Sequence, residues 1–484
     1  MNLKQLIRNL ECLHTTGSTA LSIAEIQFDS RAVTKDTLFV AIKGTLTDGH
    51  LYIDKAIELG ATAIICEKLP EKRYGSITFV QVANSALSLA LVAAEFYDHP
   101  SAKLKLVGIT GTNGKTTVVT LLHKLFTELG YHAGLLSTVQ NLVGEIVIPS
   151  THTTPNPLVL NQLLAQMVEE GCDYCFMEVS SHAVVQHRID GLTFAGGVFT
   201  NLSHDHLDFH ETFDNYIKAK KLFFDKLPKH SFALTNADDK NGMVMLQNTA
   251  AFKKTYALRT LSDYKGKVLE SHFNGMLMNI DGNELWLRLV GNFNAYNILA
   301  VYGTALLLEQ DHAKVLMVLS RINGAAGRFE TMISPNGIIA IVDYAHTPDA
   351  LENVLKTIVD LRQGTAQIIT VIGCGGDRDK TKRPEMAEVA VRLSDKVILT
   401  SDNPRTEEPL AILKDMESGI PITKRRKYFT ISDRREAIRA ACHLALPGDI
   451  VLVAGKGHET YQEVKGVRYA FDDKEVLIES FNEE

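Results

Sequence analysis

Residues 104–130 read LKLVGITGTNGKTTVVTLLHKLFTELG. The opening LKLVGIT is a short apolar run, which predicts a buried strand. GTNGKTT is a glycine-rich turn, and the apolar residues after it recur at helical spacing as far as Gly130, which stands where a helix C-cap is expected. That helical stripe consists of Val118, Leu121, Leu122, Leu125, Phe126 and Leu129. Strand, loop and helix in this order predict a phosphate-binding loop.

The chemistry of the turn lies in Gly111, Thr112, Asn113, Gly114, Lys115, Thr116 and Thr117. Backbone N–H groups of such a turn, with the N-terminus of the following helix, surround phosphate oxygens. Lys115 would reach the β- and γ-phosphates of a nucleotide, and the Thr116 hydroxyl would hold Mg²⁺. The usual spacing is not kept, because Gly108 comes one residue early and Ile109 takes the place of the first glycine. The alternative is a glycine turn that binds no ligand.

Acids and histidines follow two further strand-like runs of the same region. EVSSH, at 178–182, follows CDYCFM, and NLSHDHLDFH, at 201–210, follows GGVFT. Glu178 and His206 are candidate Mg²⁺ ligands. The three histidines of the second stretch could also indicate zinc, but a nucleotide loop without a Cys-His cluster favours magnesium. Cys172 and Cys175 form a Cys-x-x-Cys in a strand-like run, and we interpret them as reduced core thiols.

The last third of the chain alternates strands with helices. IIAIVDY, QIITVIG, KVILTSD and DIVLVAG are the predicted strands. This alternation predicts a mostly parallel sheet, in which ligands bind beyond the carboxyl ends of the strands. Each of these strands is followed by polar sequence: DYAHTPD, GCGGDRDKTKRP, SDNPRTEEP and AGKGHE. Four such loops at one sheet edge predict a site, although ordinary βα loops are also polar.

The length, net charge and apolar runs of the chain limit how these motifs can be interpreted. A chain of 484 residues is too long for one hydrophobic core and predicts about three domains. We place their boundaries at 1–97, 98–327 and 328–484, with a linker in AEFYDHPSAK at 94–103. The net charge of −7 provides no basic field for nucleic acid or an anionic membrane. The N-terminus does not read as a signal peptide and no apolar run could span a bilayer, so a cytoplasmic protein is expected.

Taken together, these motifs resemble those of the Mur ligases. The resemblance covers essentially the whole chain and rests on GTNGKTT, EVSSH, NLSHDHLDFH, YIKAKKLFF, GNFNAYN, GRFE, DYAHTPD, GCGGDRDKTKRP, DNPRTEEP and GKGHE, in this order. It implies an α/β protein of three domains: an N-terminal uridine-binding domain, a central P-loop ATPase domain and a C-terminal Rossmann-like domain that brings the amino acid. It also implies a monomer that uses ATP and Mg²⁺ to add meso-2,6-diaminopimelate to UDP-N-acetylmuramoyl-L-alanyl-D-glutamate through an acyl phosphate.

The resemblance also assigns residues. On the nucleotide side it implies Gly111 to Thr117 as the ATP loop, Thr116 and Glu178 as magnesium ligands, and His206 as a ligand of a second metal. The residues that it implies to be catalytic are Lys115, Glu178, His206 and Lys220. Lys220 matches the lysine that the family carbamylates, and its carbamate would be a further metal ligand. Further nucleotide contacts are implied for Asn294, Asn297, Arg328 and Asp343.

On the substrate side, the implied contacts to the UDP-linked peptide are Ser30, Thr153, Thr154, Ser180, Gln186 and Arg188. Those to diaminopimelate are Arg378, Asp402, Asn403, Pro404, Arg405, Gly455 and Glu459. The segment GTLTDGH around Thr45 stands where the family makes uridine contacts.

Three other functions are compatible with part of these motifs. A folylpolyglutamate synthase shares the ATPase core but lacks the N-terminal domain and the DNPR loop. A lysine-adding sister enzyme differs in the loop that ends at Arg405. A nucleotide-dependent switch would not need the loops of the last domain.

Overall fold

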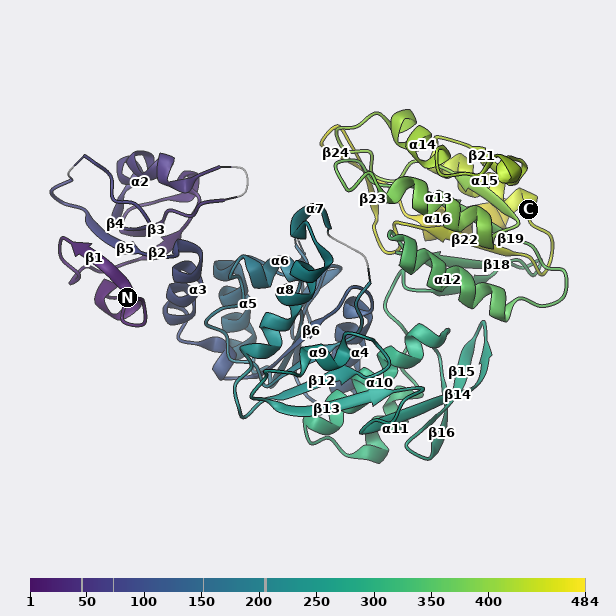
Figure 1. The fold of residues 1–484 in the computed structure, drawn as a ribbon, viewed down its shortest axis with the longest axis horizontal. Helices are drawn as coiled ribbons and strands as arrows, with labels where there is room; N and C mark the ends of the chain where they lie inside the picture. Colours follow the sequence, from purple (N-terminus) through teal and green to yellow (C-terminus); the bar gives the residue numbers. More distant parts are fainter. Residues whose placement is uncertain (45–46, 73, 151, 204–206, 484) are drawn as a thin grey trace.

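The computed structural model describes residues 1–44, 47–72, 74–150, 152–203 and 207–483 and contains three domains in chain order. The central domain lies between the other two (Figure 1). Each domain has its own sheet with helices packed on it, so the predicted α/β class and three-domain organisation are confirmed.

The N-terminal domain has a sheet of order β1-β5-β4-β3-β2, in which β1 is antiparallel to β5 and the other pairs are parallel. Helix α2 ends at Leu59 and is capped by Gly60, whose φ of 116° is the left-handed conformation that glycine adopts readily. The predicted linker at 94–103 begins too early, because α3 continues to Phe96 and buries Ala94 and Glu95. Its elements are α1 Leu3–Leu6, β1 Cys12–Thr16, β2 Glu25–Gln27, η1 Ser30–Ala32, β3 Thr37–Val40, η2 Gly49–Tyr52, α2 Ile53–Leu59, β4 Ala61–Cys66, β5 Thr78–Val82, α3 Ser85–Phe96 and η3 Pro100–Ala102.

The central domain is built on one extended sheet of order β16-β15-β14-β13-β12-β11-β6-β10-β7-β8-β9. Strand β6 lies at its centre between β10 and β11, and these three strands are parallel. One hydrophobic cluster packs α4 and α10 on the sheet, and another packs α5 and α8 on it. The first elements are β6 Lys105–Thr110, α4 Lys115–Glu128, β7 Ala133–Leu136, β8 Gln140–Val143, β9 Ile146–Pro149, α5 Pro157–Glu169, β10 Tyr174–Glu178, α6 Ser181–Val185, β11 Gly196–Phe199 and α7 Leu207–His210. They are followed by α8 Phe213–Asp225, β12 Phe232–Asn236, α9 Gly242–Met245, β13 Phe252–Ala257, β14 Tyr264–His272, β15 Gly275–Ile280, β16 Asn283–Leu287, α10 Asn292–Leu307 and α11 His312–Leu319.

The C-terminal domain has a sheet of order β17-β18-β22-β19-β20-β21. The four strands predicted here, β18, β19, β20 and β22, are neighbours and parallel, so the loops after them leave from one edge. Its elements are β17 Glu330–Ile333, β18 Ile339–Asp343, α12 Pro348–Leu361, β19 Ile368–Ile372, α13 Lys382–Leu393, β20 Lys396–Leu399, α14 Pro409–Glu417, η4 Ile422–Lys427, β21 Tyr428–Thr430, α15 Arg434–Leu444, β22 Ile450–Ala454, β23 Tyr461–Val464, β24 Val467–Ala470 and α16 Asp473–Glu483.

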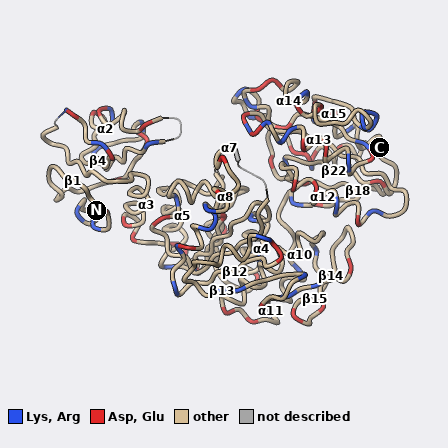
Figure 2. Tube along the Cα trace, viewed as in Figure 1, with Lys and Arg blue, Asp and Glu red and all other residues tan. Residues whose placement is uncertain are grey.

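The structure also shows how the charged residues, the apolar helices and the two neighbouring cysteines are distributed. Lysine and arginine are interspersed with aspartate and glutamate over all three domains (Figure 2). In the described part of the chain, no helix combines the length and the apolar character needed to cross a membrane. Cys172 and Cys175 are buried free thiols, and burial raises the pKa of Cys175 well above its ordinary value.

Candidate functional site

The glycine-rich turn joins the end of β6 to the start of α4, as its sequence predicts. Gly111 has φ 151°, and a Cβ there would lie 1.9 Å from the hydroxyl of Thr200, the residue after β11, so the turn passes too close to Thr200 for any side chain. Gly114 has φ 88°, and a Cβ there would lie 2.5 Å from Asn297 Oδ1. This close approach places Asn297, at the start of α10, against the loop. Asn294 joins it, because Asn297 Nδ2 donates to Asn294 Oδ1 at 3.0 Å.

Residues after β11 hold the turn in shape. The Asn113 N–H donates to Asn201 Oδ1 at 2.9 Å, and the Thr200 hydroxyl donates to the Asn113 carbonyl at 2.6 Å. The Asn113 side chain donates to Asp349 at 2.9 Å, which links the turn to α12 of the C-terminal domain. The motifs did not single out Asn201 or Asp349, although both belong to stretches quoted for the resemblance, NLSHDHLDFH and DYAHTPD.

Two lysine ammonium groups converge on one carbonyl of the turn. Lys115 Nζ donates to the Gly111 carbonyl at 2.9 Å and to the Thr112 carbonyl at 2.8 Å. Lys220 Nζ, from α8, donates to the same Gly111 carbonyl at 2.8 Å. The Lys220 side chain is 1% exposed and its ammonium lies 4.7 Å from the centre of the Tyr216 ring. Lys220 therefore lies directly beside the predicted ATP loop.

Glu178 lies at the carboxyl end of β10, beside the turn. Its Oε1 accepts from the Thr116 hydroxyl at 2.9 Å and from the Thr138 N–H at 2.9 Å. Both oxygen-bearing side chains are buried, and a carboxylate with a hydroxyl is the donor set that Mg²⁺ prefers. Thr138 is a residue that the sequence motifs missed; the rule that ligands bind beyond strand ends would have drawn attention to it after β7. His206 lies outside the described residues, as does Thr45 of the N-terminal domain.

The candidate contacts to the UDP-linked peptide adjoin Glu178. The Thr138 hydroxyl donates to the Thr153 hydroxyl at 3.0 Å, and the Thr154 hydroxyl donates to the Glu178 carbonyl at 2.8 Å. The Ser180 N–H donates to the Thr154 hydroxyl at 3.1 Å.

Two further members of this cluster hold each other in place. The Arg188 guanidinium donates to the Thr154 carbonyl at 2.7 Å and to Gln186 Oε1 at 2.6 Å. Five of the six predicted residues thus form one cluster. Ser30 is apart from them, in η1 of the N-terminal domain, where it is buried.

Arg328 and Asp343 connect the nucleotide loop to the C-terminal domain. Arg328 Nη2 donates to the Thr116 hydroxyl at 3.1 Å, and its guanidinium lies 4.5 Å from the centre of the Tyr344 ring. Asp343 accepts from the Phe329 and Ala345 N–H groups, each at 2.7 Å. Burial raises the pKa of the Asp343 carboxyl, while the nearby Arg328 opposes that shift.

The candidate amino-acid site lies on the loops after β20 and β22 and contains a cation that the sequence analysis passed over. Lys456 is fully buried, and its ammonium donates to Asn403 Oδ1 at 3.1 Å, to Glu459 at 3.2 Å and to Asp402 at 3.4 Å. Asn403 also donates to Glu459 at 2.7 Å. Asp402 and Glu459, two of the expected contacts to diaminopimelate, therefore share the Lys456 ammonium of the protein itself.

The remaining predicted residues of this site lie around it. Arg405 donates to the Gly376 carbonyl at 2.6 Å. A Cβ built on Gly455 would lie 3.8 Å from Asp402, and one on Gly376 would lie 1.9 Å from the Pro404 carbonyl. Arg378 is exposed on the loop after β19.

Comparison with known proteins shows the family of this chain. Family profiles match residues 22–97 (Mur ligase family, catalytic domain), 109–305 (Mur ligase middle domain) and 327–457 (Mur ligase, glutamate ligase domain). The UDP-N-acetylmuramoyl-L-alanyl-D-glutamate–2,6-diaminopimelate ligase of Cytophaga hutchinsonii is 58% identical over 480 residues, which are 99% of each chain. The chain belongs to the Mur ligase family.

Other relatives of this Mur ligase support the same placement. The Bacteroides fragilis protein of the same name is 55% identical over 482 residues, covering 100% of this chain and 99% of its own. A solved structure of that name superposes with a TM-score of 0.69 at 31% identity, covering 100% of this chain and 99% of its own. The Mycobacterium tuberculosis folylpolyglutamate synthase, solved with ADP and AMPPCP, superposes with a TM-score of 0.63 at 17% identity and covers only 76% of this chain and 92% of its own. The latter similarity concerns the fold alone.

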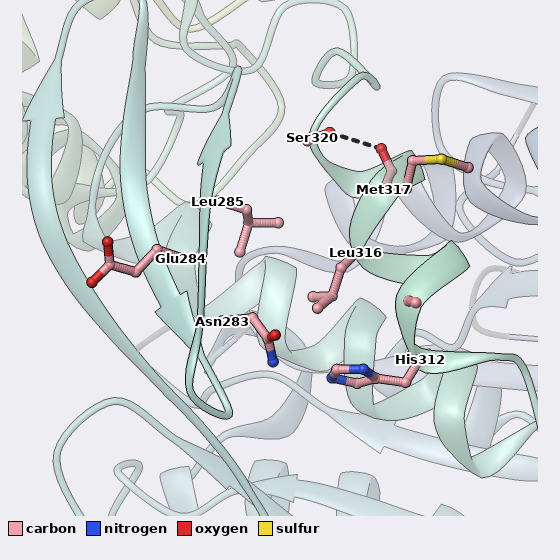
Figure 3. Close-up of a pocket in the computed structure, with 8 residues that line it drawn as sticks. Asn283, Glu284, Leu285, His312, Leu316, Met317 and Ser320 are labelled. Atoms are coloured by element: carbon pink, nitrogen blue, oxygen red, sulfur yellow. Dashed lines mark hydrogen bonds between the residues drawn. The ribbon is translucent and has the colours of Figure 1, made fainter.

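A separate hollow of this Mur ligase, of about 310 Å³, lies between β16 and α11 (Figure 3). It is lined by Asn283, Glu284, Leu285, His312, Ala313, Leu316, Met317 and Ser320. None of the candidate site residues in the described part of the chain is among these, so we do not associate the hollow with the reaction.

We predict that acid weakens the C-terminal domain through His458. Burial, with the nearby cations Arg328 and Lys456, lowers the pKa of His458 to about 4. Below its ordinary pKa of about 6.5, His458 takes up a proton in the unfolded chain but not in the folded one. The free energy of unfolding should therefore be highest above pH 6.5 and should fall by on the order of 3 kcal/mol as the pH falls toward 4.

The test is thermal unfolding of the wild type and of His458→Gln between pH 4 and 7.5. Over the acid part of this range, the melting temperature of His458→Gln should fall less than that of the wild type. His443→Gln serves as the control, because His443 lies in an exposed position on α15 of the same domain. Equal pH dependence of the wild type and His458→Gln would contradict the prediction.

Proposed function

We propose that this chain is an ATP-dependent ligase that adds meso-2,6-diaminopimelate to UDP-N-acetylmuramoyl-L-alanyl-D-glutamate in peptidoglycan precursor synthesis. The observation that carries the proposal is the continuity of three clusters. The nucleotide loop contacts Glu178, Glu178 contacts the threonines assigned to the UDP-linked peptide, and Arg328 reaches from Thr116 to the domain that holds the amino-acid loops. Relatives that match over their full length carry this activity in their names.

The chemistry has two steps that the clusters can serve. A carboxylate oxygen of the D-glutamyl residue takes the γ-phosphoryl group of ATP, and ADP leaves. The amine nitrogen of diaminopimelate then attacks the acyl carbon, the amine loses a proton, and the C–O bond to phosphate breaks. Because phosphoryl transfer needs positioning and positive charge more than covalent help, Lys115 and Arg328 are assigned to hold phosphate oxygens.

The residues present fit magnesium. Glu178 and Thr116 supply buried oxygen donors 2.9 Å apart at the end of β10. When bound, Mg²⁺ would neutralise charge on the phosphates. Asn294 and Asn297 are assigned to the adenine side of the nucleotide. Since ATP and UDP-linked precursors are cytoplasmic compounds, we place the reaction in the cytoplasm, with a monomer as the working unit.

The proposed function is tested by phosphate release from ATP in the presence of the UDP-linked dipeptide and a panel of amino acids. Release that needs both the dipeptide and diaminopimelate supports the proposal. A preference for L-lysine would identify the sister enzyme instead. Nucleotide binding without turnover would identify a switch, and activity with a folate would identify a folylpolyglutamate synthase.

We also propose that Lys220 is carbamylated. A free lysine is a cation, and here it shares the Gly111 carbonyl with the Lys115 ammonium. Two like charges beside one buried carbonyl repel each other. The ammonium loses one proton, the neutral amine nitrogen forms a bond to the carbon of CO₂, and a second proton leaves that nitrogen; the resulting carbamate is an oxygen anion on Lys220 that suits Mg²⁺.

Lys220→Ala is expected to lower ligation at least about 100-fold, since a group beside the reacting phosphoryl is removed. Acetate should restore part of the rate by supplying the missing carboxylate. The matched control is Lys221→Ala, whose ammonium pairs with Asp225 at 2.6 Å on the same helix. ¹³CO₂ labelling should give a carbamate signal in the wild type and in Lys221→Ala; its presence in Lys220→Ala, or a normal rate there, would refute the assignment.

A further inference from the structure

Two loops of the C-terminal domain that carry arginines of the amino-acid site are packed directly on each other. Loop 373–381 follows β19 and loop 400–408 follows β20. The Gly376 N–H donates to the Asn403 carbonyl at 2.9 Å, and a Cβ on Gly376 would lie 1.9 Å from the Pro404 carbonyl. The Gly376 carbonyl also accepts a hydrogen bond from Arg405 at 2.6 Å. The conformation of each loop therefore depends on its contacts with the other.

Arg405 depends on this packing for its position. It has φ 52°, a conformation that residues other than glycine rarely adopt. Its backbone is tied to the β23–β24 hairpin, because its N–H donates to the Glu463 carbonyl at 3.0 Å and its carbonyl accepts from the Lys465 N–H at 2.6 Å. An unfavoured backbone conformation persists only where the surroundings hold it, so the loops must be kept rigid.

Arg383, in the first turn of α13, lies beneath both loops. Its side chain is 1% exposed, and its two terminal nitrogens donate hydrogen bonds to the two carboxylate oxygens of Glu407 at 3.0 and 2.8 Å. The same guanidinium donates to the Gly375 carbonyl at 3.2 Å and to Asp415 of α14 at 2.8 Å. One buried side chain therefore joins the backbone of the first loop, a carboxylate of the second and the helix that follows.

Glu407 completes the connection from the second loop. Its carboxylate also accepts from the Asp377 N–H at 2.7 Å and pairs with Lys380 at 3.2 Å, both on the first loop. The hydrogen bonds from Arg383, the largest cause, lower the pKa of Glu407 to about 2. The pair is therefore ionised throughout the neutral range, and paired guanidinium and carboxylate groups of this kind hold geometry firmly.

We propose that Arg383 is a positioning residue that, through Glu407, sets the place of Arg405 and thereby the preference for diaminopimelate over L-lysine. This inference rests on the proposed function. Arg383 is too deeply buried to touch a substrate, so it acts through the loops. The planar guanidinium of Arg405 can select a substrate carboxylate only when its position is fixed to within a fraction of an ångström. Loosening the two loops should therefore reduce the preference for diaminopimelate over L-lysine before it stops the reaction.

The test compares Arg383→Lys and Glu407→Gln with the wild type, using diaminopimelate and L-lysine as alternative substrates. We expect the KM for diaminopimelate to rise about 10- to 100-fold with a smaller change in kcat, and the KM for ATP to stay the same. The ratio of kcat/KM for diaminopimelate to that for lysine should fall at least about tenfold. The double variant should be little worse than either single one, because both remove the same connection.

Arg362→Lys is the matched control. Arg362 pairs with Asp395 at 3.0 Å at the opposite end of the same sheet, so its loss should lower the melting temperature without changing the substrate ratio. Unchanged KM and substrate ratio in both Arg383→Lys and Glu407→Gln would overturn the inference and leave the pair a structural one. If Arg383→Lys does not fold, Glu407→Gln alone decides by the same criteria. A wild type that does not use diaminopimelate at all would instead overturn the proposed function, and this inference with it.

Discussion

Lys115→Ala is expected to lower ligation by about 100- to 1000-fold while the protein stays folded. The transferring phosphoryl group spreads negative charge over its oxygens, and a fixed cation aimed at them stabilises the transition state more than the ground state. In the structure the Lys115 ammonium lies over the turn, 2.9 Å from the Gly111 carbonyl and 2.8 Å from the Thr112 carbonyl. It is therefore attached to the same loop that we assign to the phosphates.

The measurement is phosphate release at saturating substrates, with circular dichroism and melting temperature as checks on folding. Lys314→Ala is the control, since Lys314 is exposed on α11 of the same domain. Lys115→Arg should recover only part of the rate, because a guanidinium is larger and differently shaped than an ammonium. A folded Lys115→Ala enzyme with near-normal turnover would remove the basis for the P-loop assignment.

Arg405→Ala is expected to lower kcat/KM for diaminopimelate by at least about 100-fold and to narrow the gap to L-lysine. Diaminopimelate differs from lysine by a carboxylate at its far end, and a guanidinium can bind a carboxylate through two parallel hydrogen bonds. In the wild type, lysine would leave this guanidinium without its partner in a closed site, which is why discrimination should be large.

The structure adds a constraint on the same pocket. Lys456 already lies between Asp402 and Glu459, so these two carboxylates with one ammonium leave a single net negative charge for the substrate's own ammonium. Steady-state rates with both amino acids measure the effect, and Arg425→Ala, an exposed arginine of η4, is the control. Equal or better use of lysine by the wild type would replace the assignment with the lysine-adding one.

Local patterns were enough to predict the elements that carry the site. The strand at 105–110, the turn and the helix that starts at Lys115 follow from contiguous sequence, because apolar periodicity and glycine act over a few residues. The same holds for β18, β19, β20 and β22, whose apolar runs are short and bounded by polar loops. Parallel pairing then required their loops to leave from one edge.

The sequence also grouped residues through the family resemblance without placing them. It assigned Glu178 and Thr116 to magnesium and Lys220 to a carbamate that would be a further metal ligand, and the structure brings all three residues to the turn. Their roles stay predictions. His206 lies outside the described residues, and Ser30 belongs to a domain apart from the other five candidate contacts to the UDP-linked peptide.

Only the tertiary structure decided which distant side chains meet. Lys220 and Lys115 share a carbonyl, Asn113 reaches Asp349, and Lys456 sits between two carboxylates, although a lysine in a polar loop is ordinarily a solvent-exposed residue. Strand order and the packing of helices on the sheet set these contacts, and neither leaves a mark in local periodicity. The chain's own sequence therefore determined what kind of chemistry it carries, while the fold decided which charges hold the loops that perform it.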